Sequence, residues 1–426
     1  MLPFYRLNKY QTQIVLLSSL GGMLEFFDFT VYALFAGYFS EQFFPSSNEM
    51  ISLIASYSIF VMGYVVRPLG GILFSYIGDA IGRKIVLIIT MILMGIASFG
   101  LGLLPTYAQI GVAAPILMLL FRLLQGLAIG GELPSMIVYV SESMSDKRGY
   151  GLGGVYSGTF AGLLPGMVIN LLILKYLTAE QIYQYGWRIP FILGGLLCIV
   201  AYKKKKKLHE SEAFKQLNTR LKNPIVEVFT KYQARLVIGI VVVAVIAAPT
   251  TLAILFMPAY LTKIAHIDAK FAGDIVLIAT IISVISMYVF GIITQKINLL
   301  HLLKILLVLF IIIGAATYWS LSQQNNFYLQ ICLYLFAIIQ GALVVVGAIL
   351  LSYLFPIEVR LTGIALAYNI SFILFGGLLP VYLTSLIIYF KSIYLVPTTL
   401  IIIISITVLL SIKKIKKFLP NNHKIN

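Results

Sequence analysis

Charged side chains are scarce in this chain of 426 residues. Asp, Glu, Lys and Arg together make up 11% of it, whereas a soluble domain carries about 25% charged residues. Hydrophobic residues make up 60%, and the mean hydropathy is +0.98. A soluble core cannot hide that much apolar surface, so we expect lipid to be the main solvent of the chain. An ordinary cytosolic enzyme and a disordered chain are thereby excluded.

Cysteine and histidine are also rare, with two and four residues. Cys198 and Cys332 both sit in apolar runs, which predicts buried thiols rather than a disulfide. The histidines fall in expected loops or helix ends, and no His, Cys or Asp spacing typical of a metal site occurs. A phosphate-binding glycine loop of the Walker type is missing as well. The sequence therefore predicts no cofactor and no direct use of ATP.

Long hydrophobic runs, by contrast, fill most of the chain. A helix that crosses a bilayer needs about 20 mostly apolar residues, and about twelve such stretches occur. We place them at 13–39, 53–77, 85–104, 114–140, 150–174, 187–202, 235–260, 272–294, 302–320, 327–355, 362–389 and 393–412. The first contains Glu25 and Asp28 and is too long for the apolar core of a signal peptide, so we expect it to remain in the protein. The pattern predicts an all-α membrane protein with twelve transmembrane helices.

The basic residues indicate how these helices are oriented. A net charge of +16 would suggest nucleic acid as the partner of a soluble protein. If the N-terminus is inside, however, the outside loops hold only Lys175, Lys263, Lys270 and Lys391. Because Lys and Arg accumulate in cytoplasmic loops, we expect both termini to be cytoplasmic and no nucleic-acid partner. The run Lys203–Lys207, which closes the sixth span, is expected to be a topology anchor in contact with anionic lipid.

Two short motifs recur at one offset. Gln125-Gly126 recurs as Gln340-Gly341, and the sequence Gly-Leu-Leu-Pro at 162–165 recurs at 377–380, both 215 residues later. The shared offset, close to half the chain length, predicts an internal duplication and hence two bundles with a solute site between them near the bilayer midplane.

A long polar stretch defines the expected domain boundaries. We expect an N-terminal six-helix bundle at 1–202, a cytoplasmic basic linker at 203–234, and a C-terminal six-helix bundle with a short cytoplasmic tail at 235–426. At the offset of the repeat, Arg122 corresponds to Ala337. Almost every intramembrane charge lies in the first half, so we expect that half to carry the coupling chemistry.

Glu25 and Asp28 lie near the middle of the first span. They are three residues apart and therefore share one face of a helix. A charge at the centre of a bilayer costs at least ~2.5–3.5 kcal/mol and usually faces a cavity or a partner. Two close carboxylates resist double ionisation, so one of them is suited to carry a transported proton. The alternatives are a structural ion pair with Arg67 or Arg122, and direct contact with a solute.

Arg122 and Glu132 lie ten residues apart in the fourth span. That spacing corresponds to about 15 Å of helix rise, so the two cannot pair directly on one straight helix. Arg122 offers a planar fork to carboxylates, which suits either a carboxylate of the solute or one of the acids of the first span. The alternative is a static buried ion pair.

A short loop joins the second and third spans, with the sequence Gly78-Asp79-Ala80-Ile81-Gly82-Arg83-Lys84. Asp79 could cap the N-terminus of the third helix. It could also hold the cytoplasmic end closed by pairing with a basic group across the loop.

This loop, with Arg67-Pro68-Leu69-Gly70-Gly71 before it, resembles the signature between helices two and three of the major facilitator superfamily. More narrowly, the chain resembles the metabolite–proton symporter family, which includes proline/betaine, 2-oxoglutarate, citrate and shikimate permeases. The motifs that carry this resemblance are Glu25-Phe26-Phe27-Asp28-Phe29 with Tyr32, Arg122-Leu123-Leu124-Gln125-Gly126, Gly130-Gly131-Glu132, Lys147-Arg148-Gly149, Gly186-Trp187-Arg188-Ile189-Pro190-Phe191, Glu210-Ser211 with Phe214, Phe355-Pro356, Val359-Arg360, Thr362-Gly363, Tyr368-Asn369, and Phe375-Gly376-Gly377 with Pro380.

The resemblance implies the major facilitator fold, two pseudo-symmetric six-helix bundles that move solute by alternating access. By residue matching, it implies that Glu25, Asp28, Arg122 and Glu132 line a central cavity or couple to it. We expect the same proton-coupling and solute site to include Tyr32, Gln125, Tyr368 and Asn369. It also implies a cytoplasmic gate formed by Asp79, Arg83 and Arg148. We expect the gate to include Arg67, Lys84, Glu142, Glu358 and Arg360 as well.

We therefore expect a proton-coupled symporter in the inner membrane of a bacterium, acting as a monomer as in the family that it resembles. The solute would be a small polar metabolite, either an organic anion or a zwitterion such as proline or betaine, because Arg122 favours a carboxylate. The proton gradient would supply the energy without a cofactor. The main alternative is an exporter or exchanger on the same scaffold. A sensor that binds solute without moving it, and an enzyme, are the remaining alternatives, and no catalytic constellation is evident for the enzyme.

Overall fold

The computed structural model describes residues 7–47, 49–206, 208–216, 223–323 and 325–419. These residues form helices and connecting turns, without a strand among them. Twelve helical segments within these ranges are long and apolar enough to cross a membrane, which confirms the expected number of spans. They are Lys9–Phe43, Ile51–Ala80, Arg83–Leu103, Ala113–Ser143, Ser145–Tyr176, Ala179–Lys205, Gln233–Leu255, Ala269–Ile293, Leu299–Gln323, Asn326–Leu354, Ile357–Phe390 and Leu395–Lys416.

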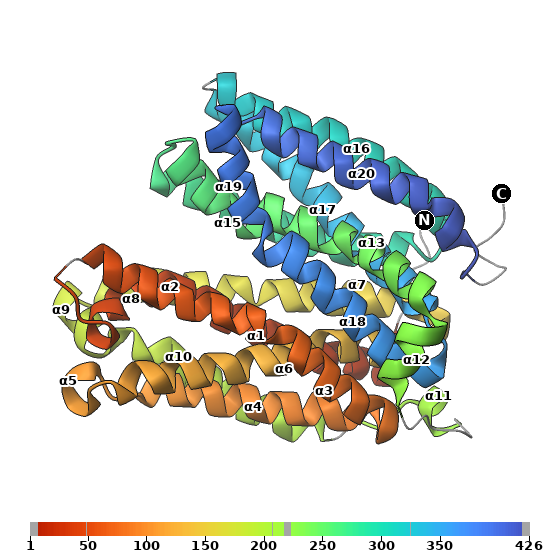
Figure 1. Ribbon diagram of the computed structural model, residues 1–426, viewed down its shortest axis with the longest axis horizontal. Helices are drawn as coiled ribbons and strands as arrows, with labels where there is room; N and C mark the ends of the chain where they lie inside the picture. Colours follow the sequence, from red (N-terminus) through yellow and green to blue (C-terminus); the bar gives the residue numbers. More distant parts are fainter. Residues whose placement is uncertain (1–6, 48, 207, 217–222, 324, 420–426) are drawn as a thin grey trace. The chain divides into compact units, whose positions relative to one another are not determined.

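The chain divides into two compact units (Figure 1). Unit 1 comprises Met1–Tyr139 and Gly158–Gln216, and unit 2 comprises Val140–Ser157 and Leu217–Asn426. The boundaries fall inside two helices, so the end of α6 and the start of α7 belong to unit 2. The helices that contribute to unit 1 are α1 (Lys9–Phe43), α2 (Glu49–Val65), α3 (Arg67–Ala80), α4 (Arg83–Leu103), α5 (Tyr107–Ile110), α6 (Ala113–Ser143), α7 (Arg148–Ala161), α8 (Leu163–Tyr176), α9 (Ala179–Gln181), α10 (Arg188–Lys205) and α11 (Glu212–Lys215).

Unit 2 continues with α12 (Pro224–Lys231), α13 (Gln233–Thr250), α14 (Met257–Ala259), α15 (Ala269–Ile293), α16 (Leu299–Ser320), α17 (Asn326–Leu354), α18 (Arg360–Phe372), α19 (Leu379–Phe390) and α20 (Leu395–Lys416). Single π-helical turns lie within spans at Ile182–Gly186 and Ile373–Gly377, at the end of a span at Thr251–Leu255, and between two spans at Tyr260–Ile264. Short 3₁₀ turns lie at Ser145–Lys147, Leu321–Gln323 and Ile357–Val359.

Local sequence signals explain where several helices begin. Asn8 and Gln11 form a capping box at the start of α1, so that each side chain satisfies a backbone N–H of the other residue. Pro68 occupies the first turn of α3, where its missing N–H has no helical partner to lose. Gly82, with φ +149°, forms the turn between α3 and α4, a backbone conformation that side chains with a Cβ rarely adopt.

The two Gly-Leu-Leu-Pro copies adopt matching local structures. In the fifth span, α7 ends at Ala161 and α8 begins at Leu163. In the eleventh span, a π-helical turn ends at Gly377 and α19 begins at Leu379, with Pro380 in its first turn. Both copies therefore break a span and restart it near a proline, and the segment before the break is α-helical in the first copy and π-helical in the second.

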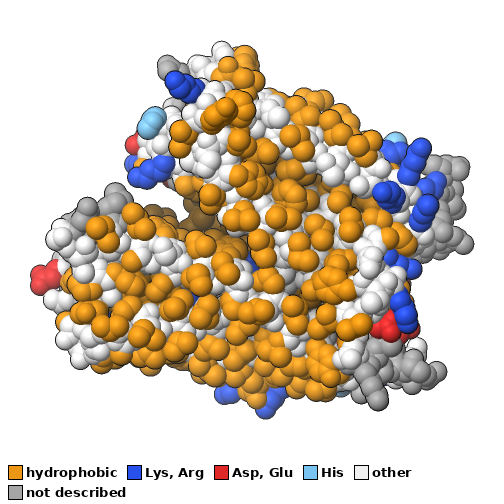
Figure 2. All heavy atoms as spheres, in the orientation of Figure 1, with side chains coloured by type: hydrophobic (Ala, Val, Ile, Leu, Met, Phe, Trp, Pro, Cys, Tyr) orange, Lys and Arg blue, Asp and Glu red, His pale blue; other side chains and the backbone are white. Residues whose placement is uncertain are grey.

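Apolar side chains cover the outside of the helices as well as their core. Leu171 is 59% exposed, Ile285 58% and Leu410 76%. Hydrophobic side chains are spread over the face shown in Figure 2, and the charged ones lie towards its edges. Exposed apolar surface on this scale fits a lipid environment, so the chain is a multi-pass membrane protein.

Candidate functional site

A small polar cavity lies inside unit 1, between α1, the second span and α6. Its polar lining consists of Glu25, Asp28, Tyr64, Arg67, Arg122 and Gln125. All these residues except Tyr64 were expected to be functional. Glu25, Asp28, Arg67, Arg122 and Gln125 are also buried, and buried charges of this kind in a membrane span mark a site by default.

Asp28 is held by neutral partners. The hydroxyl of Ser98 and the side-chain amide of Gln125 (3.1 Å) both donate to Oδ2 of Asp28. The amide oxygen of Gln125, Oε1, accepts a hydrogen bond from Nη1 of Arg122 at 2.5 Å. Gln125 therefore links the carboxylate to the guanidinium without direct contact between the two charges. Among the described residues, Oδ1 of Asp28 has no hydrogen-bond partner.

Glu25 has a cation beside it. Nη2 of Arg67 lies 3.7 Å from Oε1 of Glu25, and the Arg67 guanidinium lies 4.0 Å from the centre of the Tyr64 ring. Arg67, which was expected in the cytoplasmic gate, lies at the cavity with the first-span acids. Oε2 of Glu25 has no hydrogen-bond partner within the described part of the chain.

The Arg122 guanidinium packs against aromatic rings, and two of its nitrogens have no hydrogen-bond partner among the described residues. Its guanidinium carbon lies 3.5 Å from the centre of the Tyr32 ring, and Phe60 lies on another side at 5.3 Å. The Tyr32 hydroxyl itself donates to the carbonyl of Ser56 at 2.9 Å. Nε and Nη2 of Arg122 are buried and make no hydrogen bond to any described residue. An arginine fixed by aromatic rings, with unused donors at a polar cavity, is suited to bind a carboxylate.

Glu132 occupies a separate site in unit 1. Nζ of Lys205 forms an ion pair with its Oε1, and the hydroxyl of Thr90 donates to its Oε2. Lys205 is 0% exposed. Gly21 provides the room, because a Cβ at that position would overlap the Glu132 carboxylate. Glu132 was expected to line the central cavity, and the structure places it in a buried ion pair instead.

Lys205 is therefore a buried partner, whereas the run Lys203–Lys207 as a whole was interpreted as a lipid-facing anchor. The helical spacing of Lys205 could have indicated its burial, because Cys198, Ala201 and Lys205 share one buried face of α10. Because residues 203–207 are all lysine, the residue types alone do not distinguish Lys205 from its neighbours.

Lys205→Met is expected to destabilise the protein by about 3–5 kcal/mol, because it leaves the Glu132 carboxylate buried without its cation. The double variant Glu132→Gln/Lys205→Met should recover most of this stability, since neither side chain is then charged. Thermal unfolding of the purified variants measures the effect. The control is Lys204→Met, which removes the exposed neighbouring lysine and should leave the midpoint unchanged. If Lys205→Met and Lys204→Met lowered the unfolding midpoint by the same amount, this result would contradict the buried ion pair.

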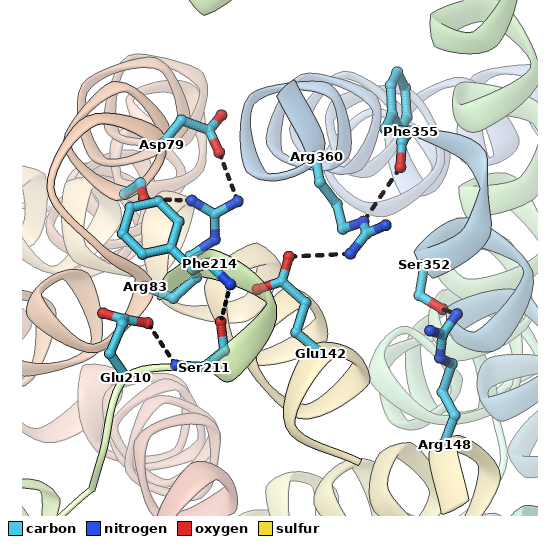
Figure 3. A network of polar contacts seen from close by, with 11 residues as sticks. Asp79, Arg83, Glu142, Arg148, Glu210, Ser211, Phe214, Ser352, Phe355 and Arg360 are labelled. Carbon is cyan, nitrogen blue, oxygen red and sulfur yellow. Dashed lines mark hydrogen bonds and ion pairs between the residues drawn. The ribbon is translucent and has the colours of Figure 1, made fainter. Parts of the chain in front are cut away.

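A second cluster of unit 1 lies where α3 turns into α4 (Figure 3). Nη2 of Arg83 lies 3.1 Å from Oδ1 of Asp79, and Nη1 of Arg83 donates to the Gly78 carbonyl at 2.7 Å. The interpretation of Asp79 as an N-cap is wrong, because Gly82 occupies the N-cap of α4 and Asp79 belongs to the last turn of α3. The alternative, pairing with a basic group across the loop, is the arrangement present.

The chain after α10 covers this cluster. The ring of Phe214 lies 4.4 Å from the Arg83 guanidinium, and Oε2 of Glu210 accepts from the backbone N–H of Lys84 at 3.1 Å. Arg83 is consequently fully buried. Lys84 contributes here through its backbone.

Unit 2 contains the other expected gate residues (Figure 3). Nη1 of Arg360 lies 3.1 Å from Oε1 of Glu142, and Nε of Arg360 donates to the Phe355 carbonyl at 3.2 Å. Nη1 of Arg148 donates to the Ser352 hydroxyl at 3.3 Å. The ion pair joins the fourth span to the start of the eleventh. Glu358, expected in the same network, is exposed.

The expected cavity residues of the second half lie on α18. Tyr368 stacks on Phe372 with ring centres 4.5 Å apart, and Asn369 donates to the carbonyl of Ala365 at 2.9 Å. Both are buried within unit 2.

Unit 2 also contains a buried polar residue that was not among the expected site residues. Gln340, the repeat counterpart of Gln125, accepts from the Ser283 hydroxyl and donates to Thr250 at 3.0 Å. The repeat offset could have indicated its role, because Gln125 performs the same bridging in unit 1.

Ligands of a metal are not clustered in the described part of the chain, where no group of three or more His, Cys, Asp or Glu side chains could hold an ion. Cys198 is buried and Cys332 half-buried, and both are free thiols.

Comparison with known proteins places this arrangement in context. Residues 18–380 match the family model described as Major Facilitator Superfamily. A proline/betaine transporter of Salmonella typhimurium is 31% identical over 385 residues, covering 85% of this chain and 75% of the relative. A glycine betaine/proline/ectoine/pipecolic acid transporter of Dickeya dadantii is 30% identical over 377 residues, with the same two coverages.

Two solved structures have a similar fold. The proton:xylose symporter XylE, bound to 6-bromo-6-deoxy-D-glucose, gives a TM-score of 0.78 at 16% identity, with 96% of each chain covered. The fucose:proton symporter FucP of E. coli gives a TM-score of 0.67 at 13% identity, covering 95% of this chain and 99% of that one.

Proposed function

The chain belongs to the major facilitator superfamily and is a secondary transporter of small solutes rather than an enzyme; we propose that its solute is a zwitterion that bears a carboxylate, in the class of proline and betaine, taken up together with protons. The observation that carries this proposal is Arg122, whose Nε and Nη2 have no partner among the described residues although they are buried at a polar cavity. A solute carboxylate would satisfy both donors. The names of the two relatives above support the same class of solute.

The cavity also supports the proton-coupling role. Asp28 has only neutral side-chain hydrogen-bond partners, Ser98 and Gln125, so no cation is in direct contact with its carboxylate. Glu25 has Arg67 beside it, with Nη2 of Arg67 3.7 Å from Oε1 of the carboxylate. A proton on Asp28 removes the cost of an unpaired buried charge. Its release leaves a carboxylate that Gln125 connects to Arg122. We therefore assign the transported proton to this pair of acids.

The transport cycle follows from the two halves of the sequence. We propose that the halves 1–202 and 235–426 alternate in access around the bound solute, with the basic segment 203–234 and both termini in the cytoplasm of a bacterium. The proton gradient across the inner membrane supplies the energy without a cofactor, and one chain suffices for a complete cycle. Tyr368 and Asn369 would contribute solute contacts from the second half.

The remaining charged residues are proposed to form the cytoplasmic gate. Asp79 with Arg83, and Glu142 with Arg360, would act as two latches, and Lys84, Arg148 and Glu358 belong to the same proposal. Glu142 and Arg360 come from different halves of the sequence, so in the proposed cycle an opening between the halves at this end would break their ion pair.

Glu142→Gln is expected to shift the protein towards the state in which this end is open, because the latch loses its ionic partner. The measurement is thiol labelling of Ser352→Cys, which replaces a buried residue beside Arg148. Labelling should be several-fold faster when the latch is removed. Glu227→Gln, which breaks the exposed ion pair between Glu227 and Lys231 at 2.9 Å, is the control and should not change the rate. Equal labelling rates in the two variants would rule out the latch.

The identity of the solute is tested by counterflow in proteoliposomes loaded with labelled proline or betaine. Unlabelled proline, betaine, citrate, 2-oxoglutarate and xylose are then added outside in turn. We expect exchange with proline or betaine and none with xylose. Exchange restricted to the di- and tricarboxylates, or to the sugar, would refute the proposed class of solute.

A further inference from the structure

An apolar groove runs along the outside of unit 1, between α4 and α10. Its volume is about 650 Å³. Ile92, Ile96 and Phe99 form one wall and Ile199 the other, while the buried thiol of Cys198 lies at the back. The groove is separate from the polar cavity, with which it shares no lining residue.

The groove faces the bilayer. Ile92 is 40% exposed, Ile96 53% and Ile199 44%, although all three are apolar. The wall from Met91 to Phe99 covers about 12 Å of helix rise. That length is close to half of the ~30 Å hydrocarbon core, the depth that one leaflet's acyl chains fill. An acyl chain lying along the groove would therefore reach from one headgroup region towards the midplane.

Positive charge gathers at one end of the groove. Tyr202 and Lys203 form its mouth, and Nζ of Lys206 lies 4.7 Å from the centre of the Tyr202 ring. Lys203 and Lys206 are exposed, and neither forms an ion pair with a described residue. Lys205 between them is turned inward to Glu132, so the lysines at the mouth are free for an anion from outside the protein.

We propose that this groove binds one anionic phospholipid, with an acyl chain along α4 and α10 and its phosphate held by Lys203 and Lys206. The apolar lining provides affinity for any acyl chain. The two unpaired lysines provide the preference for an anionic headgroup, and Tyr202 lies at the level where aromatic rings favour the interface. This site would act alongside solute transport and does not depend on which solute is carried.

The test uses the full chain carrying Ile199→Trp, reconstituted in phosphatidylcholine vesicles. Dibrominated phosphatidylglycerol or dibrominated phosphatidylcholine is added in increasing proportion, and quenching of the new tryptophan reports which lipid occupies the groove. The signal of the native Trp187 and Trp319 is subtracted with the parent chain. We expect phosphatidylglycerol to be preferred on the order of 5-fold for each lysine that contacts the headgroup.

Two charge variants decide the cause of the preference. Lys203→Gln/Lys206→Gln should abolish it, whereas Lys413→Gln/Lys414→Gln, which removes two exposed lysines at the end of α20, should leave it intact. Ile96→Trp, on the opposite wall, replaces the reporter if Ile199→Trp does not fold. Equal quenching by the two lipids in the parent reporter, or equal loss of preference in both charge variants, would overturn the proposal.

Discussion

Replacing Asp28 by Asn is expected to abolish accumulation of solute against its gradient while sparing exchange of solute for solute. A pH difference of one unit corresponds to 1.36 kcal/mol for each proton, enough for about tenfold accumulation when one proton accompanies one solute. Asn keeps the shape of the side chain and still accepts the hydrogen bond from Ser98, but it cannot release a proton. The accumulation ratio under a pH gradient should therefore fall to about one.

The control for Asp28→Asn is Glu41→Gln, which neutralises an exposed acid on the same helix. That variant should accumulate solute normally. Glu25→Gln should behave as Asp28→Asn does if the two acids share the proton. If Asp28→Asn and Glu25→Gln both still concentrate solute, the two acids are structural partners and the coupling assignment fails.

Arg122→Lys is expected to weaken solute binding about 10- to 100-fold, because hydrogen bonds to a charged group contribute roughly 1.5–3 kcal/mol. Lysine keeps the charge but loses the planar fork that can bind two carboxylate oxygens at once. It also loses the donation to Gln125 that connects this residue to Asp28. Direct binding of labelled proline or betaine to the purified protein measures the change.

Two controls separate this effect from a general loss of structure. Arg188→Lys should bind solute normally, because Arg188 donates to the carbonyls of Gly102 and Leu104, which an ammonium group can also satisfy. Choline, which lacks the carboxylate of betaine, should bind poorly to the native protein and no worse to Arg122→Lys. Unchanged affinity for betaine in Arg122→Lys would rule out Arg122 as the carboxylate site.

The architecture could be predicted because lipid imposes a simple pattern on the sequence. Twelve apolar stretches correspond to twelve helical segments of membrane-spanning length in the described part of the chain, and the two Gly-Leu-Leu-Pro copies break equivalent spans. The helix ends were less predictable. The sixth span was expected at 187–202, but it extends from Ala179 to Lys205. Its C-terminal end continues to a lysine that is buried against Glu132.

The site could be predicted as a set of residue types but not as a set of partners. Burying Glu25, Asp28 and Arg122 in a membrane requires a function or a partner, and this made them candidates. Which residue neutralises which depends on how the helices rotate and cross, and the sequence does not record this. Arg67 consequently joined the cavity instead of the gate, and Gln125 proved to be the bridge between Asp28 and Arg122.

The central claim, proton-coupled uptake of a carboxylate-bearing zwitterion, is tested most directly by accumulation in proteoliposomes. The purified chain is reconstituted, an inside-alkaline pH gradient is imposed, and labelled proline and betaine are supplied outside. The account predicts that at least one of them rises above its external concentration and that an added protonophore returns it to equilibrium. Solute that equilibrates or exchanges but never concentrates would contradict the account and favour an exchanger on the same scaffold.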